Sequence, residues 1–255
     1  RRSDGGVIVT ASHNSAEYNG FKLVRSKARP VGEGNGMEEV AAIAMRQNFK
    51  SSGKPGSVQQ DNQVFRDLAE YILKSVDSKG VQPLKIVVDA GNAVGSLEIN
   101  ELFKHLPIEL VPLYFELDGT FPNHPANPLK PENLIDLQQA VIKHQADLGI
   151  ALDGDGDRIF MVDEKGEELP QAILRGLMAQ IELKQHPDST VCYDIRPGRV
   201  TKDMIEEAGG NAVVTKVGHS LIKQTMLEHN AVFGGESSGH YFYQTEYGTF
   251  EMPSL

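Results

Sequence analysis

The six residues from Asp153 onward read Asp-Gly-Asp-Gly-Asp-Arg and place three carboxylates at alternating positions on a turn that two glycines loosen. Apolar runs precede and follow this turn, which is typical of a strand, a tight loop and a second strand. Three like charges at this spacing repel one another unless a cation lies between them. Oxygen ligands without Cys or His nearby suit Mg²⁺ or Ca²⁺ rather than Zn²⁺. We therefore expect Asp153, Asp155 and Asp157 to bind a hard cation.

Two other interpretations of this loop are weaker. An EF-hand needs glycine at its sixth position for a sharp turn, whereas Arg158 stands there when Asp153 is counted as the first residue. Glu164 does fall at the twelfth position, but the flanking residues have the pattern of strands rather than helices. A solvated acidic turn without a ligand needs neither three aspartates nor an arginine at the end of a buried strand. The metal-binding interpretation is therefore favoured.

Length and charge narrow the possible function classes. At 255 residues, the chain is longer than one average domain and can hold two or three α/β units. A hydrophobic share of 40% is typical of a globular protein. The formal net charge of −10 argues against nucleic acid or an anionic membrane as a partner. A small anionic substrate remains compatible with this charge, because local charge decides its binding.

The single cysteine, Cys192, cannot form an internal disulfide, and we infer a reducing, cytoplasmic location. It lies in the strand-like segment 190–193, which favours a position in the core over a role as nucleophile. We find no signal-peptide pattern and no apolar run of about 18 residues. The sequence starts without Met and inside a regular pattern, so we expect a fragment of a longer chain.

A second group of polar residues follows the apolar run 7–9, where Ser12 and His13 lie on a predicted strand-end loop. Ligands bind at such loops in open α/β sheets. A catalytic triad is disfavoured here because neighbouring residues rarely point at each other, and a helix-capping serine is the simpler alternative. Lys22 returns to the same end after a turn at residues 19–20, and three further basic residues make the neighbourhood cationic.

A third polar loop, from Gly234 to His240, follows the apolar residues 231–233. Glu236 and Ser238, which lie between glycines, suit paired hydrogen bonds to neighbouring sugar hydroxyls. His240 is suited to moving protons or to contacting phosphate. A plain Gly/Ser turn is the alternative that composition alone allows.

Predicted strands and helices alternate along most of the chain. The expected strands are residues 7–9, 85–89, 108–115, 148–152, 159–162, 190–195, 212–217 and 231–233. The expected helices are residues 37–49, 64–76, 96–106, 132–145, 172–183, 201–208 and 221–228. This alternation implies consecutive α/β domains with mixed, mostly parallel sheets and right-handed crossovers. The active site should then lie at the strand-end loops between domains.

Taken together, these loops resemble the α-D-phosphohexomutase family, closest to its bacterial phosphomannomutase/phosphoglucomutase branch. Each motif is short, but all of them in this order and spacing are very specific, and the resemblance runs along essentially the whole chain. The matching segments are Thr10–Asn14 for the phosphoserine loop, Tyr18–Lys22 behind it, Asp153–Arg158 for the metal loop and Gly235–His240 for the sugar-recognition loop. Weaker matches are Asp194–Arg196, where relatives often carry Lys, and Lys216–Ser220.

The resemblance implies phosphoryl transfer between a phosphoserine and a hexose phosphate. Ser12 would donate its phosphoryl group to a hexose monophosphate, and the resulting hexose 1,6-bisphosphate, also the implied activator, would return its other phosphate to Ser12. The implied ligands of one Mg²⁺ per site are Ser12, Asp153, Asp155 and Asp157. The implied catalytic residues are Ser12, Lys22, Arg158 and His240. The implied substrate-binding residues are Arg196, His219, Glu236 and Ser238.

Each of these residues has a chemistry that fits its implied role. Arg158 would stabilise charge on the transferring phosphoryl group. Lys22 and His240 are candidates for general acid or base catalysis on the sugar hydroxyl. Glu236 and Ser238 would bind hydroxyls whose positions match in both orientations of the sugar.

The resemblance also divides the chain and marks departures from the family. It implies a partial domain 1 at residues 1–61, domain 2 at 62–168 and a partial domain 3 at 169–255. Ser15 stands where the family usually has Pro, and Gln244–Pro253 lacks the acidic run typical of close relatives. The opening of the first domain and a fourth domain with the main distal phosphate clamp are expected to be missing from this sequence.

Two alternatives and several details stay open at this point. The alternatives are a magnesium-dependent sugar-phosphate phosphohydrolase, in which water takes the phosphoryl group, and a non-catalytic sugar-phosphate-binding module. The sequence does not choose between glucose and mannose, nor between a monomer and a homodimer. The expected partners are small sugar phosphates, with no nucleic acid and no membrane.

Overall fold

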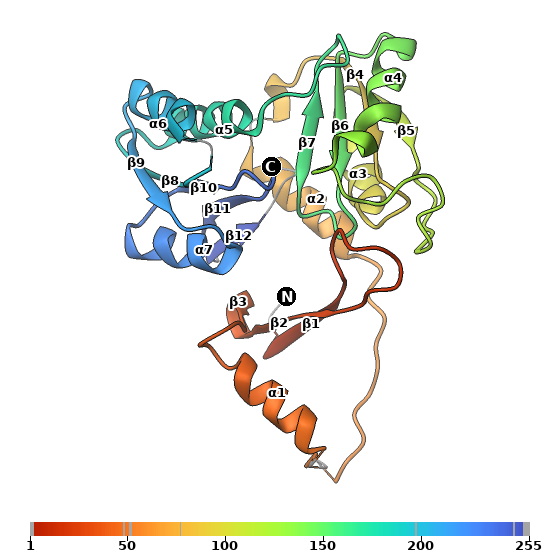
Figure 1. Cartoon of the computed structure of the whole chain (residues 1–255), viewed down its shortest axis with the longest axis vertical. Coiled ribbons are helices and arrows are strands. Elements are labelled where there is room, and N and C mark those ends of the chain that lie inside the picture. Colours follow the sequence, from red (N-terminus) through yellow and green to blue (C-terminus); the bar gives the residue numbers. More distant parts are fainter. Residues whose placement is uncertain are drawn as a thin grey trace.

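The computed structural model of the chain describes residues 3–47, 49–50, 53–76, 78–196, 198–246 and 248–251. Its helices and strands form three α/β units that follow one another along the sequence (Figure 1). The predicted α/β class with mixed sheets is confirmed. Within the described ranges, no helix is both long and apolar enough to cross a membrane.

The first unit is a small antiparallel sheet followed by one helix. Its elements are β1 (Gly5–Val9), β2 (Phe21–Arg25), the 3-10 helix η1 (Ser26–Ala28), β3 (Arg29–Pro30) and α1 (Met37–Arg46). The register pairs Val9 with Phe21, and a 3.0 Å hydrogen bond from the Thr10 N–H to the Gly20 carbonyl closes the loop that carries Ser12. The chain leaves α1 through a long linker that runs to the second unit (Figure 1).

The second unit contains a four-stranded sheet in the order β5-β4-β6-β7. Its elements are α2 (Val64–Ser75), η2 (Ser78–Gly80), β4 (Leu84–Asp89), α3 (Gly95–Phe103), β5 (Ile108–Leu113), η3 (Pro131–Leu134), α4 (Ile135–His144), β6 (Leu148–Leu152) and β7 (Ile159–Val162). The strands β5, β4 and β6 are parallel, and β7 is antiparallel to β6. Because Leu152 pairs with Ile159, the three aspartates lie on the tight connection between two buried strands.

Helices cover both faces of this sheet, which explains the uninterrupted apolar run of β4. Val87 and Val162 are fully buried on one face, against Leu137 of α4. On the other side, α2 packs against α3 through Ile72 and Leu102. The sheet is therefore fixed from both sides, and its strand ends can hold the metal loop in place.

The third unit contains a five-stranded sheet in the order β12-β11-β10-β8-β9. Its elements are α5 (Gln171–Gln185), β8 (Thr190–Asp194), α6 (Gly198–Glu207), β9 (Asn211–Thr215), α7 (His219–Glu228), β10 (Phe233–Gly235), β11 (Tyr241–Thr245) and β12 (Gly248–Glu251). The strands β10, β8 and β9 are parallel, with α5 and α6 on one face and α7 on the other (Figure 1). Cys192 is fully buried beside Ile222 and Met226 of α7, and burial raises the pKa of its thiol to about 12. It is a core residue, as predicted.

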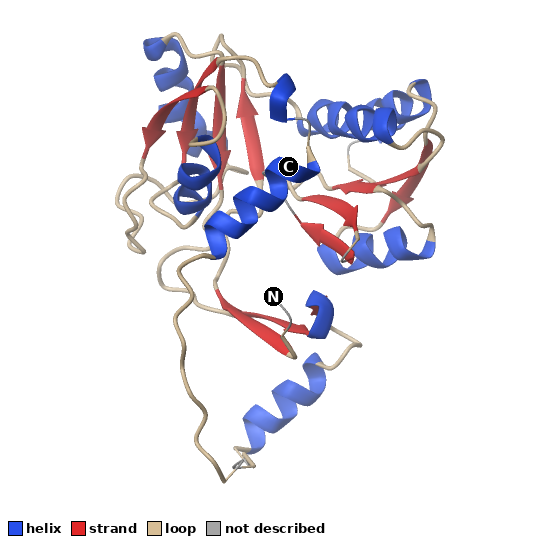
Figure 2. Ribbon diagram, turned by 180° about the vertical axis from the view of Figure 1, so that it is seen from behind, coloured by secondary structure: helices blue, strands red, loops and turns tan. Residues whose placement is uncertain are grey.

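The second and third units share one hydrophobic core. A single cluster of buried side chains joins Ile150 and Ile159 of the second sheet to Leu174, Phe233 and Tyr241 of the third unit. The two units lie side by side in both views, with the first unit below them (Figure 2). No side chain of the first unit, in its described part, belongs to this cluster.

The strand pattern differs from the expectation at β2, β3, β11 and β12, which the apolar periodicity does not predict. These strands are short, pair antiparallel and carry polar residues, so their stability comes from partners rather than from their own sequence. Lys22, which the sequence predicts to return to the same end after a turn, lies within β2. The helix expected at 37–49 ends at Arg46, with residue 48 outside the described residues, as are Pro253 and Leu255.

Candidate active site

Three loops, one from each unit, meet at the junction of the three sheets (Figure 1). They are the loop after β1 with Ser12, the β6–β7 loop with the aspartates, and the loop after β10 with His240. Gly154 lies so close to the Ser12 carbonyl oxygen that a Cβ atom there would clash with it. The Ile159 N–H donates a 3.1 Å hydrogen bond to the Gly239 carbonyl, which ties the second loop to the third.

Ser12 has an unusual backbone conformation and a direct contact to the acidic loop. Its φ of 54° lies in the left-handed region, which a residue other than glycine adopts at a cost. Its N–H donates to Thr10 Oγ1 at 2.8 Å, and Thr10 Oγ1 donates in turn to Asp155 Oδ2 at 3.1 Å. The Ser12 hydroxyl donates to Asp153 Oδ2 at 2.9 Å. The loop therefore presents this hydroxyl to the carboxylates.

His13 does point at its neighbour, contrary to the argument made from sequence. Its Nδ1 lies 3.3 Å from Ser12 Oγ. Burial and the positive charge of Arg158 lower the pKa of His13. Among the described residues, no hydrogen bond joins its other ring nitrogen to a carboxylate, so the arrangement lacks the third member of a triad.

The three aspartates of the β6–β7 loop converge, as a shared ion requires. Each of Asp153, Asp155 and Asp157 contributes a carboxylate oxygen to a group that lies within 4.8 Å. Burial, with repulsion from the other two carboxylates, raises the pKa of Asp153 to about 7. Asp155 Oδ1 is buried and has no hydrogen-bond partner in the structure. An oxygen-only donor set with such an orphaned atom fits Mg²⁺.

Lys22 reaches the same carboxylates from β2. Its Nζ lies 2.6 Å from Asp155 Oδ2 and 2.5 Å from Asp157 Oδ2. Burial disfavours its charge, but these two carboxylates outweigh that effect and raise the pKa of Lys22. Lys22 thus carries a positive charge that partly neutralises the acidic loop.

Arg158 of the second unit meets His240 of the third unit at one side of the site. Arg158 Nε lies 3.2 Å from His240 Nε2 and 3.5 Å from Asp153 Oδ2. Although burial lowers it, contacts with Asp157 and Glu236 raise the pKa of His240 to about 9. A protonated His240 ring cannot accept a hydrogen bond from Arg158. The contact with Arg158 and the ion pairs with the carboxylates therefore belong to different protonation states of His240. Arg158 Nη1 is buried without a partner and is available to an anion.

Glu236 and Ser238 gather around the same histidine. Glu236 Oε1 accepts a 2.6 Å hydrogen bond from the Gly218 N–H, and its Oε2 lies 3.4 Å from His240 Nδ1. Ser238 Oγ lies 2.7 Å from that ring nitrogen. Burial alone would raise the pKa of Glu236, but the hydrogen bonds from His240 and Gly218 outweigh burial and lower it. This carboxylate is therefore ionised.

Arg196 and His219 lie at the rim and do not contact the aspartates of the metal loop. Arg196 follows β8, and its half-exposed guanidinium pairs with Asp194 at 3.0 Å. His219 is the exposed first residue of α7, next to Gly218, which binds Glu236. Both residues therefore flank the loop after β10, which carries Glu236 and Ser238.

Two residues of the site were not singled out by the sequence reasoning. Thr10, within the matching serine-loop motif, bridges Ser12 to Asp155. Glu251 lies 3.5 Å from His240 and 3.1 Å from Lys223. Thr10 could have been found from its motif, whereas Glu251 depends on β12, which the sequence pattern does not predict.

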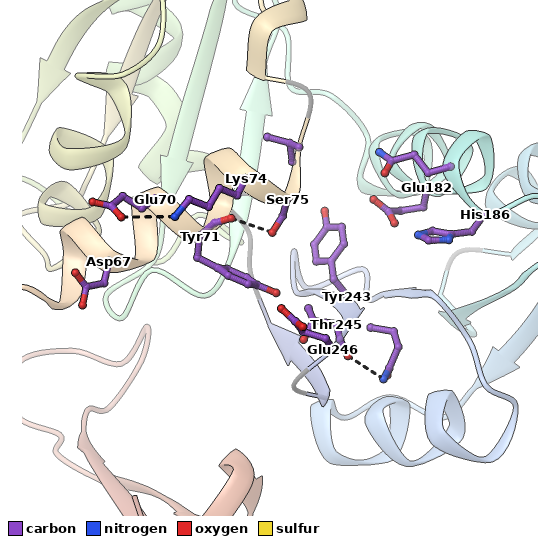
Figure 3. Close-up of a pocket in the computed structure, with 13 residues that line it drawn as sticks. Asp67, Glu70, Tyr71, Lys74, Ser75, Glu182, His186, Tyr243, Thr245 and Glu246 are labelled. Carbon is purple, nitrogen blue, oxygen red and sulfur yellow. Dashed lines mark hydrogen bonds and ion pairs between the residues drawn. The ribbon is translucent and has the colours of Figure 1, made fainter. Parts of the chain in front are cut away.

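A separate cavity of about 540 Å³ lies between α2 and the third unit (Figure 3). Tyr71 of α2 and Tyr243 of β11 line it, together with acidic residues such as Glu70 and Glu182. None of the predicted site residues lines this cavity. The chemistry is therefore assigned to the loop junction.

Family models place this arrangement in a known class of protein. The model of phosphoglucomutase/phosphomannomutase α/β/α domain I matches residues 1–51, that of domain II residues 65–166 and that of domain III residues 170–250. The chain therefore belongs to the phosphoglucomutase/phosphomannomutase family.

Individual relatives agree with this assignment. The chain is 41% identical over 243 residues to the phosphohexose mutases of Xanthomonas campestris pv. campestris, and 40% identical over 249 residues to phosphomannomutase of Escherichia coli. These matches cover 95% and 94% of this chain but only 54% of each relative, so the chain spans about half their length. A solved phosphoglucomutase/phosphomannomutase family protein from Burkholderia thailandensis superposes with a TM-score of 0.85 at 36% identity, covering 96% of this chain and 52% of that one.

Proposed function

We propose that the protein to which this chain belongs is a phosphohexomutase that interconverts hexose 1-phosphate and hexose 6-phosphate. The observation that carries the proposal is the position of Ser12, whose hydroxyl lies 2.9 Å from Asp153 within the convergent carboxylate cluster. A serine in this position can carry a phosphoryl group whose oxygens face a metal ion. The relatives named phosphomannomutase and phosphohexose mutases support the same activity.

In the proposed mechanism, Ser12 alternates between hydroxyl and phosphoserine. Mg²⁺, held by the three aspartates and the phosphoserine, would neutralise charge that develops on the phosphoryl oxygens. The bond between phosphorus and Ser12 Oγ breaks as a bond to a sugar hydroxyl forms, which gives a hexose 1,6-bisphosphate. The bisphosphate then returns its other phosphoryl group to Ser12. Arg158, with its unpartnered Nη1, would contact the transferring group.

A proton must leave the attacking sugar hydroxyl and later return to the other oxygen. Lys22 and His240 are the candidates to move it, because both contact Asp157 at the edge of the carboxylate cluster. They approach from opposite units, Lys22 from β2 and His240 from the loop after β10. This placement suits a reaction in which the sugar presents either end to Ser12.

Glu236 and Ser238 are proposed to bind the middle of the sugar ring, and Arg196 and His219 to contact its distal end. Glu236 already accepts a backbone hydrogen bond through one oxygen, which leaves the other for a hydroxyl near His240. Glu236 and Ser238 lie on the loop after β10, Arg196 follows β8 and His219 begins α7. A mutase needs a loop that can bind the sugar ring in either orientation.

The finer features of the proposal follow the family pattern. We propose one Mg²⁺ per site, hexose 1,6-bisphosphate as activator, and glucose or mannose phosphate as substrate in a cytoplasmic monomer or homodimer. The solved N-acetylphosphoglucosamine mutase from Aspergillus fumigatus is described in complex with GlcNAc-6P and magnesium. It is 18% identical to this chain. The proposed domain limits are residues 1–61, 62–168 and 169–255.

A coupled assay of the full-length protein with glucose 1-phosphate or mannose 1-phosphate tests this function. With Mg²⁺ and a trace of the bisphosphate, we expect the corresponding hexose 6-phosphate and no net release of inorganic phosphate. Release of inorganic phosphate without isomerised sugar would identify a phosphohydrolase instead. Binding of the sugar phosphate without either product would leave a binding module and refute the mutase proposal.

A further inference from the structure

Arg175 of α5 is charged and yet completely buried, with 0% of its side chain exposed. Arginine is almost never fully buried unless it is paired. Its guanidinium carbon lies 5.7 Å from the centre of the Tyr193 ring, and it has hydrogen-bond partners on several elements. The residue therefore holds neighbouring segments together from inside the third unit.

One set of contacts reaches the end of β8. Arg175 Nη1 lies 2.5 Å from Asp194 Oδ1, and Nη2 donates to the carbonyl of Arg196 at 3.0 Å. Burial alone would raise the pKa of Asp194, but hydrogen bonds from Ser237 and the charge of Arg175 lower it. Asp194 is consequently an ionised partner that fixes both arginines, since Arg196 pairs with its other oxygen.

A second set of contacts reaches the loop after β10. Arg175 Nη1 donates to Ser237 Oγ at 3.2 Å and lies 3.4 Å from the Gly235 carbonyl. Ser237 also binds Asp194, with its hydroxyl at 2.8 Å and its N–H at 3.1 Å. The carbonyl of Arg196 lies close to the same hydroxyl and is an alternative acceptor for its single hydrogen. Ser237 thus contacts Arg175 and Asp194, while its neighbours Glu236 and Ser238 contact His240.

Two features show that this arrangement is built around the arginine. Thr201 of α6 accepts from Arg175 Nη2 at 2.9 Å and donates to the Ala172 carbonyl at 2.8 Å, so the hydroxyl locks the guanidinium in one orientation. Gly235 has no side chain, and a Cβ atom there would lie 2.6 Å from Arg175 Cγ. The close approach of the strand to the arginine stem depends on this glycine.

We infer that Arg175 is a positioning residue that fixes the loop of Glu236 and Ser238 relative to Arg196. The inference rests on the proposed function, in which these three residues bind the sugar phosphate. Arg175 itself does not touch the substrate. It sets the distance between two substrate-binding segments, so its loss should weaken substrate binding more than the chemical step.

The test compares variants of the full-length protein. Arg175→Met keeps much of the side-chain volume but removes every donor. Ser237→Ala removes the hydroxyl contacts of the loop with Arg175, Asp194 and the Arg196 carbonyl, and keeps the backbone N–H bond to Asp194. Arg199→Met is the matched control, because Arg199 is 90% exposed on α6 and its partner Asp203 is 3.9 Å away. The readouts are KM and kcat for hexose 1-phosphate, and amide hydrogen exchange of residues 235–240.

Both Arg175→Met and Ser237→Ala should raise KM by about tenfold, equivalent to about 1.4 kcal/mol of binding, with a smaller change in kcat. Exchange of residues 235–240 should speed up in both variants and not in Arg199→Met. If Arg175→Met does not fold, Ser237→Ala still decides the question. Unchanged KM and unchanged exchange in an active, folded Ser237→Ala protein would overturn the inference. A wild-type protein without mutase activity would refute the proposed function instead, and exchange would still show whether Arg175 fixes the loop.

Discussion

At the scale of single residues, the site concentrates features that cost free energy. Ser12 adopts a left-handed backbone conformation, and Asp153 is fully buried beside two other carboxylates. Backbone strain of this kind costs about 1–3 kcal/mol and persists where the surroundings impose it. Here the Thr10 hydroxyl and the close approach of Gly154 impose it. Such costs are expected where a serine must face a metal site.

Asp155 provides the sharpest residue-level prediction for the metal. Asp155→Asn replaces an ionised ligand by a neutral one, and calorimetric titration of Mg²⁺ should show binding weakened by at least about tenfold. Because the change also relieves repulsion among the carboxylates, unfolding of the metal-free protein should need the same or more denaturant. Asp203→Asn on α6 is the control and should bind Mg²⁺ as the wild type does. Equal Mg²⁺ affinity of Asp155→Asn and wild type would contradict the assigned ligand set.

At the scale of elements, the loops depend on tight approaches that only glycine allows. Gly239 has a φ of +87°, and a Cβ atom there would lie 2.8 Å from the Phe160 ring and 3.0 Å from the Ile159 carbonyl. Gly209 has a similar φ of +81° but no atom within 4 Å of the same position. A comparison of alanine substitutions at Gly239 and Gly209 therefore separates the cost of the backbone conformation from the cost of the clash with Phe160 and Ile159.

Gly239→Ala should destabilise the protein more than Gly209→Ala does. Both changes carry a left-handed cost of about 1–2 kcal/mol. Only Gly239→Ala adds overpacking, which costs about 1–3 kcal/mol. Denaturant unfolding of the two variants measures the difference. Equal losses in the two variants would show that the third loop moves away from β7 without cost, against the contact seen between Ile159 and Gly239.

The loop after β5 is attached to β4 by a half-buried histidine, His124. His124 Nε2 lies 2.9 Å from Asp89 Oδ2, and its Nδ1 lies 2.9 Å from the Pro125 carbonyl. Burial lowers the pKa of His124, but the bond and charge of Asp89 outweigh this and raise it. Protonated His124 therefore stabilises the folded protein. This stabilisation is fully present below the pKa of His124 in the unfolded chain, about 6.5, and is lost as pH rises through its higher pKa in the folded protein.

His124→Gln should therefore lower the free energy of unfolding most at pH 6, with a smaller difference from wild type above the folded pKa. Urea unfolding of both proteins between pH 6 and 9 measures the difference at each pH. A difference that stays constant across this range would mean that the protonated ring does not contribute to stability.

Sequence patterns predict those elements whose own apolar residues form a continuous run or a helical period. The buried runs of β4 and β6 and the aspartate loop between β6 and β7 are of this kind. The strands β11 and β12 are different, because β12 (Gly-Thr-Phe-Glu) gains its place by pairing with β11 and by its contact with Lys223 of α7. The position of Glu251 and the contacts of Arg175 follow from such tertiary pairing. No local pattern could have indicated either of them.

At the scale of the whole molecule, the roles are divided among the three units. The first supplies Ser12 and Lys22, the second the carboxylates and Arg158, and the third His240 with the rest of the loop after β10, which we propose recognises the sugar. The second and third units share one hydrophobic core, whereas the first sheet contributes none of its described residues to it. The β6–β7 loop and the loop after β10 are thus held together by packing, and the loop after β1 meets them through contacts such as Ser12 with Asp153.

The most direct test follows the phosphoryl group from Ser12. The full-length protein, labelled with radioactive phosphate on Ser12, is mixed with unlabelled hexose 1-phosphate and Mg²⁺, and the products are separated after quenching. The label should leave Ser12 only when sugar and Mg²⁺ are both present, and should appear first in hexose 1,6-bisphosphate and then in hexose 6-phosphate. Label that passes to inorganic phosphate, or that stays on Ser12 while isomerised sugar accumulates, would contradict the account.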